Sequence, residues 1–193
     1  MAVLLFDVMD TLVWDPFRLL PAHFRLSFPE LLQQKHPTAW ARFERGELDH
    51  AGFCREFFED GRTVDEDALR QLLCENYRYL PGIPELLLEL NQAGHELHAL
   101  SNYPEWYTWI EAKLGLSEYL RWSFVSCLTG LRKPDPRAYE QAARTLSVQK
   151  VSELWFIDDR DENVEAARQV GLSALRFEDA SQLRAALHSA GLL

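Results

Sequence analysis

Short strand-like segments recur along the chain, and polar residues follow each of them. They occupy residues 2–6, 95–100, 124–127, 154–157 and 173–177. Two of them, residues 2–6 and 154–157, are uninterrupted apolar runs, which are typical of strands buried on both faces of a parallel sheet. Apolar residues at helical spacing occupy residues 84–92, 104–114, 136–146, 163–170 and 181–189. This alternation predicts an α/β fold in which helices cover both faces of a parallel sheet.

The segment between the first two predicted strands has a different pattern. Its apolar residues recur at helical spacing over residues 28–35, 38–44, 49–58 and 65–77, without a strand pattern. We therefore expect two units. Residues 1–14 and 80–193 would form an α/β core domain, and residues 15–79 would form a helical insertion between its first two strands.

Composition narrows the possible functions. The 193 residues are 47% hydrophobic and 26% charged, which is typical of one folded domain with a modest insertion. Thirty acidic and 20 basic residues give a net charge of −10, so the basic surface of a nucleic-acid-binding protein is not expected. The three cysteines lack metal-type spacing and predict reduced thiols.

The chain carries no recognisable targeting or membrane segment. No apolar run approaches the roughly 20 residues of a membrane helix, and the first residues lack the basic region of a signal peptide. We expect no membrane partner and a cytoplasmic protein, or one from which a leader has been removed. The oligomeric state is left open.

The polar residues that follow the predicted strands are the candidates for chemistry. Asp7 follows the first strand, and Ser101 and Asn102 follow the second. Because the carboxyl ends of parallel strands meet at one edge of a sheet, these residues are expected to form one site. Asp7 could attack phosphorus or bind a hard metal ion, or it could simply cap a turn. Ser101 and Asn102 precede a helix and suit an anion, or a plain helix cap.

Two further positions extend this site. Asp158 and Asp159 follow a buried apolar strand, and two adjacent carboxylates repel each other unless a divalent cation such as Mg²⁺ relieves the repulsion. The alternative is a pair of turn acids that cap the next helix. Lys133 could neutralise a phosphoryl oxygen and the Asp7 carboxylate, or it could be a solvated surface lysine.

The order of these motifs resembles the haloacid dehalogenase-like (HAD) hydrolase superfamily. The resemblance rests on Phe6-Asp7-Val8-Met9-Asp10-Thr11-Leu12, Ser101-Asn102, Lys133-Pro134 and the segment 156–164. It implies a Rossmann-like core in which the helical insertion is a cap domain. More narrowly, residues 35–40, 102–107 and 132–136 look like those of plant chloroplast flavin mononucleotide (FMN) hydrolases. That likeness implies FMN as the small-molecule phosphate ester, and the plastid stroma as the compartment if a transit peptide has been removed.

The resemblance also implies a role for each motif. Asp7 would attack phosphorus and form an aspartyl-phosphate that water then hydrolyses. Mg²⁺ would be bound by Asp7, the carbonyl of Met9, Asp158 and Asp159. The substrate phosphate would be held by Ser101, the Asn102 backbone and Lys133, together with Thr11.

Met9 is the departure from the family pattern. Phosphatases of the superfamily usually carry a second Asp at this position, which protonates the leaving group and later activates water. Methionine cannot transfer a proton. Asp10, a residue such as His23, or a water could substitute, or the protein could be a slow phosphatase or a non-catalytic relative that binds a phosphometabolite.

Other activities of the superfamily stay open as alternatives. A sugar-phosphate phosphatase, a mutase or a dehalogenase would share most of the motifs, although the Asp158-Asp159 pair favours a Mg²⁺ enzyme over a dehalogenase. A flavin ring would stack on aromatic side chains. Most aromatic residues of the insertion are expected in its core, which leaves Trp14 and Tyr103 as the stacking candidates.

Overall fold

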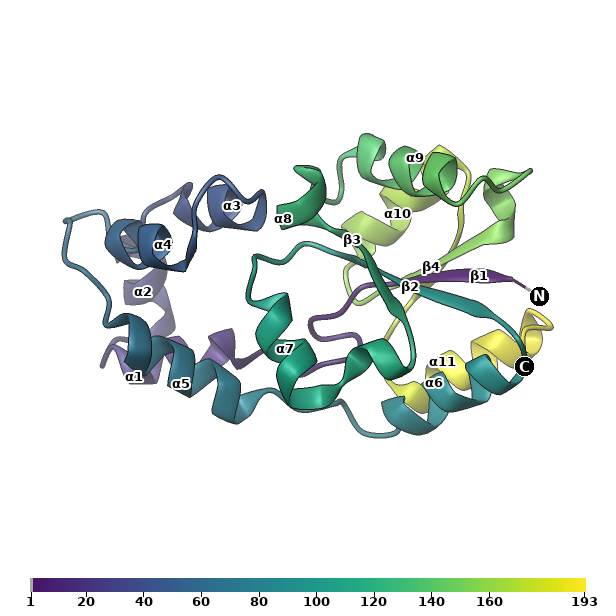
Figure 1. Cartoon of the computed structure of the whole chain (residues 1–193), viewed down its shortest axis with the longest axis horizontal. Coiled ribbons are helices and arrows are strands. Elements are labelled where there is room, and N and C mark those ends of the chain that lie inside the picture. Colours follow the sequence, from purple (N-terminus) through teal and green to yellow (C-terminus); the bar gives the residue numbers. More distant parts are fainter. Residues whose placement is uncertain (1) are drawn as a thin grey trace.

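The computed structural model describes residues 2–193 and contains one sheet of five parallel strands. The order across the sheet is β3-β2-β1-β4-β5 (Figure 1). The strands are β1 (Val3–Phe6), β2 (Glu96–Ser101), β3 (Arg121–Val125), β4 (Leu154–Asp158) and β5 (Ser173–Arg176). This confirms the predicted α/β fold with a Rossmann-like parallel sheet.

Helices cover both faces of the sheet because the central strand buries side chains on both sides. Leu4 and Phe6 of β1 join one apolar cluster, and Leu5 joins the other, as the alternation along a strand requires. The first cluster includes residues of α6 (Ile83–Gln92), α7 (Tyr107–Leu114) and α11 (Ala180–Ser189). The second includes residues of α9 (Pro136–Thr145) and α10 (Asp161–Val170).

The helical insertion lies beyond the carboxyl ends of the strands, at the left of Figure 1. Its elements are η1 (Pro16–Leu19), α1 (Leu20–His23), α2 (Phe28–Gln34), α3 (Ala39–Glu44), α4 (His50–Glu56) and α5 (Glu66–Asn76). The two chain segments that connect it to the core run side by side. The Trp14 amide donates to the Arg78 carbonyl at 2.9 Å, and the Leu80 amide donates to the Leu12 carbonyl at 2.9 Å.

Several element boundaries differ from the sequence-based expectation, and three elements show this clearly. The third strand begins at Arg121, and the predicted strand end, Ser126 and Cys127, belongs to the short helix α8 (Ser126–Thr129). The early residues of this edge strand are only partly buried, so they do not read as an apolar run. Helix α7 begins at Tyr107, whose amide bonds the Pro104 carbonyl in a turn, and α10 begins two residues earlier than expected.

Three short elements complete the description. They are the 3₁₀ helices η2 (Leu116–Glu118) and η3 (Val151–Glu153), together with α8. Over residues 2–193, every helix is too short or too polar to cross a lipid bilayer.

Candidate active site

The centre of the site is a buried lysine between two carboxylates. Asp7 follows β1, Asp158 ends β4, and Lys133 precedes α9. The Lys133 Nζ atom donates to Asp7 Oδ1 at 2.8 Å and to Asp158 Oδ2 at 2.6 Å. Only 3% of Lys133 is exposed, so its charge depends on these two partners. The fold therefore brings together Asp7 and Lys133, which lie 126 positions apart in the sequence.

The charges of this cluster shift the pKa values of its members. Burial alone would lower the pKa of Lys133, but the charges of Asp7 and Asp158 and their hydrogen bonds outweigh burial and raise it. Burial raises the pKa of Asp7 despite the opposing effect of Lys133, and Asp158 and Asp159 raise it further. Three carboxyl groups thus share one ammonium group, which leaves an excess of negative charge.

Asp158 is fixed on all sides. Its carboxylate accepts hydrogen bonds from Lys133, from the Arg160 amide at 2.8 Å and from Asn163 Nδ2 at 3.0 and 3.1 Å. The side chain is fully buried. Asp158 therefore holds Lys133 in place, and Asn163 in the first turn of α10 holds Asp158. Asn163 lies in the segment 156–164 that carries the family resemblance, but no role was predicted for it, because its contact with Asp158 depends on where that helix begins.

Asp159 is more accessible than Asp158. Its backbone amide donates to Thr11 Oγ1 at 3.1 Å, and its carboxylate accepts no hydrogen bond from residues 2–193. Burial raises the pKa of Asp159, and the charges of Asp158 and Asp10 add to the rise. Carboxylate oxygens of Asp7, Asp158 and Asp159 lie within 4.8 Å of one another. An oxygen-rich, negatively charged cluster of this size fits a divalent cation such as Mg²⁺.

The Asn102 side chain, in the loop after β2, has a structural role that was not predicted. The Asn102 carboxamide does not face an open position: its Nδ2 donates to the Lys133 carbonyl and its Oδ1 accepts from the Lys133 amide, both at 2.8 Å. It thereby fixes the loop that carries Lys133. The Ser101 hydroxyl is 2% exposed and has no hydrogen-bond partner within residues 2–193.

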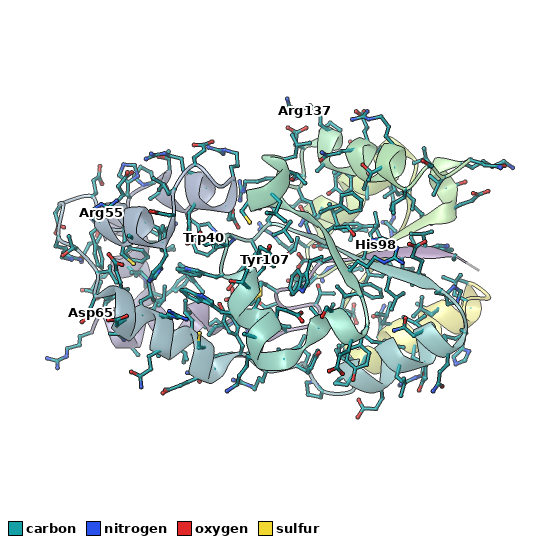
Figure 2. All side chains as sticks on the ribbon, viewed as in Figure 1. Trp40, Arg55, Asp65, His98, Tyr107 and Arg137 are labelled. Atoms are coloured by element: carbon teal, nitrogen blue, oxygen red, sulfur yellow. The ribbon has the colours of Figure 1, made fainter. Side chains whose placement is uncertain are left out.

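A cavity of about 270 Å³ joins the strand ends to the helical insertion. Its lining comprises Asp7, Met9, Asp10, Asp15, Trp40, Glu44, Asn102, Tyr103, Arg132, Lys133, Asp159, Arg160 and Asn163. Trp40 of α3 lies between the insertion and the core in Figure 2, and its ring centroid is 6.3 Å from that of Tyr103. The Tyr103 hydroxyl in turn bonds the Tyr77 hydroxyl at 2.9 Å.

An ion pair across this cavity joins the insertion to the core. Glu44 ends α3, and its carboxylate lies 2.5 Å from the Arg132 guanidinium. Glu44 is 4% exposed, and burial raises its pKa to about 7 although Arg132 lowers it. Sequence reasoning missed both residues. Arg132 adjoins Lys133 and could have been selected, whereas Glu44 is indistinguishable in sequence from a solvated acid at a helix end.

Asp10 lines the cavity and has an uncommon backbone conformation. Its φ is +57°. Its Oδ2 forms an ion pair with Arg18 and accepts a hydrogen bond from Arg18 Nη2 at 2.5 Å. Its Oδ1 accepts from the Asp15 amide at 3.2 Å. Met9 lines the same cavity without offering an acid, as the sequence indicates.

Five of the residues selected from the sequence do not line the cavity: Ser101 and Asp158, described above, and Trp14, Thr11 and His23. Trp14 lies outside the lining, and the Arg78 guanidinium stacks 3.8 Å from its ring centroid. Thr11 is fully buried and accepts the Asp159 amide, so it ties two site loops together. His23 borders a different hollow of the insertion, beside Phe24.

Comparison with known proteins agrees with this geometry. A family model described as haloacid dehalogenase-like hydrolase matches residues 1–171. The chain is 45% identical to the chloroplast flavin mononucleotide hydrolase 1 of Arabidopsis thaliana over 98% of this chain and 78% of the relative. It is 29% identical to a phosphoglycolate phosphatase of Pseudomonas savastanoi over 72% of this chain and 51% of that enzyme.

The fold also matches solved structures. A HAD family enzyme from Bacteroides thetaiotaomicron, crystallised with magnesium and inorganic phosphate, superposes with a TM-score of 0.78 at 19% identity, covering 95% of this chain and 98% of that one. The extent of the family match, over residues 1–171, decides the classification. The chain therefore belongs to the haloacid dehalogenase-like hydrolase family, and within it to the enzymes that hydrolyse phosphoric monoesters.

Proposed function

We propose that the protein is a Mg²⁺-dependent phosphatase that hydrolyses a small phosphate monoester through an aspartyl-phosphate, with FMN as its substrate. The observation that supports this most strongly is the Asp7 carboxylate at the end of β1. It is held by Lys133 and clustered with Asp158 and Asp159. A carboxylate nucleophile beside an ammonium group and a cation site is what phosphoryl transfer through an aspartyl-phosphate requires.

Each residue around Asp7 has its own role in the proposed phosphoryl transfer. Lys133 engages Asp7 Oδ1, so Oδ2, which has no hydrogen-bond partner within residues 2–193, is the oxygen that attacks phosphorus. The Lys133 ammonium stabilises the charge on the phosphoryl oxygens. The unpartnered Ser101 hydroxyl and the Asn102 backbone amide donate to the same oxygens. Asp158 and the Asn102 side chain position Lys133.

The donor set also fits the metal ion. Asp7, Asp159 and the Met9 carbonyl would hold Mg²⁺, with Asp158 beside it. When bound, the ion supplies positive charge that neutralises the phosphoryl oxygens. Magnesium in the crystals of the Bacteroides thetaiotaomicron enzyme supports this assignment.

FMN is supported by the likeness to the Arabidopsis thaliana hydrolase, which extends over nearly the whole chain. Trp40 and Tyr103 in the cavity wall offer aromatic faces beside the phosphate site. The chloroplast designation of that relative also supports the plastid among the two predicted compartments.

A short sugar- or hydroxyacid-phosphate is the second candidate substrate. The cavity volume of about 270 Å³ and its largely polar lining suit a phosphate with a small, hydroxylated leaving group. Similarity to a phosphoglycolate phosphatase points the same way.

A phosphate-release panel tests these proposals. Purified protein is assayed for phosphate release with FMN, phosphoglycolate and a hexose phosphate, and for halide release with a 2-haloacid, each with Mg²⁺ and with excess EDTA. We expect turnover of FMN that EDTA abolishes and added Mg²⁺ restores. Full activity in EDTA would refute the metal assignment, and preference for phosphoglycolate would replace FMN by the second candidate.

A further inference from the structure

We propose that Asp15, at the entrance to the helical insertion, is the proton carrier that replaces the missing acid at Met9. This inference rests on the proposed phosphatase function and adds a catalytic residue to it. An alkoxide leaving group needs a proton, and general acid catalysis of that kind typically contributes 10²–10⁴-fold. Met9 lines the cavity where such an acid would act, so another cavity residue must supply it.

The other acids of the cavity wall are already committed. Both oxygens of Asp10 are engaged, one by the Arg18 guanidinium at 2.5 Å and one by the Asp15 amide at 3.2 Å. Glu44 is paired with Arg132 at 2.5 Å. Asp7 and Asp159 belong to the proposed nucleophile and cation cluster. Each of these carboxylates therefore has a cationic partner or a task in the proposed mechanism.

Asp15 differs from them in its contacts. One oxygen, Oδ1, accepts a hydrogen bond from the Phe17 amide at 2.9 Å, which fixes the side chain at the start of η1. The other oxygen has no hydrogen-bond partner within residues 2–193, and no ion pair forms with the carboxylate there. A positioned carboxyl group with one free oxygen in the cavity wall can hold a proton and release it.

The surroundings of Asp15 favour the protonated form. Burial raises its pKa to about 6, the Phe17 amide and Arg18 oppose the rise, and Asp10 and Asp159 contribute to it. The hydroxyls of Tyr77 and Tyr103 are the other titratable groups that face it, and burial raises the pKa of both well above 10, so they stay neutral. Asp15 thus titrates near neutrality, as a group that must both give and take a proton should.

The proton then follows a balanced cycle. In the first step an Asp7 oxygen bonds to phosphorus, the bond from phosphorus to the ester oxygen breaks, and the Asp15 carboxyl protonates the leaving oxygen to give an alcohol. In the second step the Asp15 carboxylate takes a proton from water, the water oxygen bonds to phosphorus, and the acyl-phosphate bond to Asp7 breaks. Inorganic phosphate leaves, and both carboxyl groups return to their starting forms.

Asp15→Asn tests this directly, because the amide oxygen can still accept the Phe17 hydrogen bond. FMN has an alkoxide leaving group, whereas p-nitrophenyl phosphate releases a stable phenolate that needs no proton. We expect turnover of FMN to fall by about 10²–10⁴-fold. With p-nitrophenyl phosphate we expect a rapid burst of one p-nitrophenolate per enzyme followed by slow turnover, because only the second step needs the base.

Matched variants separate this role from the alternatives. Asp65→Asn removes the charge of a helix cap in the same insertion, at the start of α5, and should behave as wild type. Asp15→Glu should recover part of the FMN turnover that Asp15→Asn loses. Loss of the p-nitrophenolate burst in Asp15→Asn, an unchanged FMN rate, or a selective loss in Asp10→Asn but not in Asp15→Asn would overturn the assignment.

The wild-type protein offers a second test that needs no variant. The rate of the first step with FMN should fall about tenfold per pH unit above a pH near 6, where Asp15 loses its proton, whereas the p-nitrophenolate burst should not. Parallel pH profiles for the two substrates would contradict the inference. Full activity of Asp7→Asn would instead refute the phosphatase mechanism itself.

Discussion

At the scale of single residues, the site depends on one lysine that pairs with two acids. Lys133 and Asp158 are almost completely buried, and Asp7 is 8% exposed. A buried charge of this kind is tolerated only when its partners and their remaining hydrogen bonds are all in place. Asn102 and Asn163 supply those additional bonds, so the four residues act as a unit.

We predict that Lys133→Met destabilises the protein by about 3–5 kcal/mol, because two buried carboxylates lose their cationic partner. Urea unfolding in the absence of Mg²⁺ measures this change. Lys113→Met, at an exposed position in α7, is the control and should change the free energy of unfolding by less than about 0.5 kcal/mol. A loss of less than about 1 kcal/mol in the free energy of unfolding of Lys133→Met would show that Lys133 and its two carboxylate partners are not buried as described.

The sequence could indicate the residues that follow strands but not those that depend on packing. Asp7, Lys133, Asp158 and Asp159 were selectable because parallel strands place their carboxyl ends at one edge. Asp15 was not selectable. Asp15 is a candidate because it is partly buried and has one carboxylate oxygen without a hydrogen bond from residues 2–193. Neither property can be predicted from the sequence Trp14-Asp15-Pro16.

At the scale of elements, helix α3 and helix α8 meet through their backbones. Gly46, just after α3, has a φ of +73°, and a Cβ atom there would lie 2.5 Å from the Cys127 carbonyl oxygen of α8. The Ser126 hydroxyl donates to the Glu44 carbonyl at 2.5 Å in the same contact. This contact fixes the end of α3, which carries Glu44 to the cavity.

We predict that Gly46→Ala destabilises the protein more than Gly61→Ala does. Both glycines have positive φ values, of +73° and +80°, so both substitutions carry the cost of about 1–2 kcal/mol for a left-handed residue. Only Gly46 also meets a core backbone atom, whereas the space around Gly61 is open within 4 Å. Equal free energies of unfolding for the two variants would contradict the contact between α3 and α8.

The order and type of the elements were predictable because their apolar patterns are strong, but the edge strand was not. β3 begins with an exposed Arg121 and two partly buried residues, so its pattern resembles a loop until Phe124. Its register with β2 also shifts between His98 and Leu100. The hydrophobic pattern therefore failed to predict the start of β3, a strand that has a neighbouring strand on one side only.

At the scale of the whole molecule, the insertion and the core domain share one apolar cluster. Leu4 and Leu87 of the core belong to the same cluster as Phe43, Phe53 and Leu69 of the insertion. Trp106 lies between them: its ring packs on Phe43 at 5.0 Å, and its Nε1 donates to His50 Nδ1 at 3.1 Å. The predicted boundaries at 14/15 and 79/80 separate two segments of the sequence, but side chains from both segments pack in the same apolar cluster.

We predict that the two units unfold together. Because the shared cluster would be exposed by separation of either unit, calorimetry should show one transition with equal calorimetric and van't Hoff enthalpies. Near-UV circular dichroism, which reports aromatic packing, should change at the same midpoint as the far-UV signal. Two resolved transitions would show that the insertion folds independently of the sheet.

The central claim is that Asp7 is the residue that takes the phosphoryl group. The most direct measurement is acid quenching of the working enzyme with Mg²⁺ and FMN, followed by mass spectrometry of the peptide that contains Asp7. The account predicts a phosphoryl group on Asp7 in the wild type, and a folded Asp7→Asn protein with neither this modification nor phosphate release. Phosphate release by Asp7→Asn at the wild-type rate, or a phosphoryl group on a different residue, would contradict it.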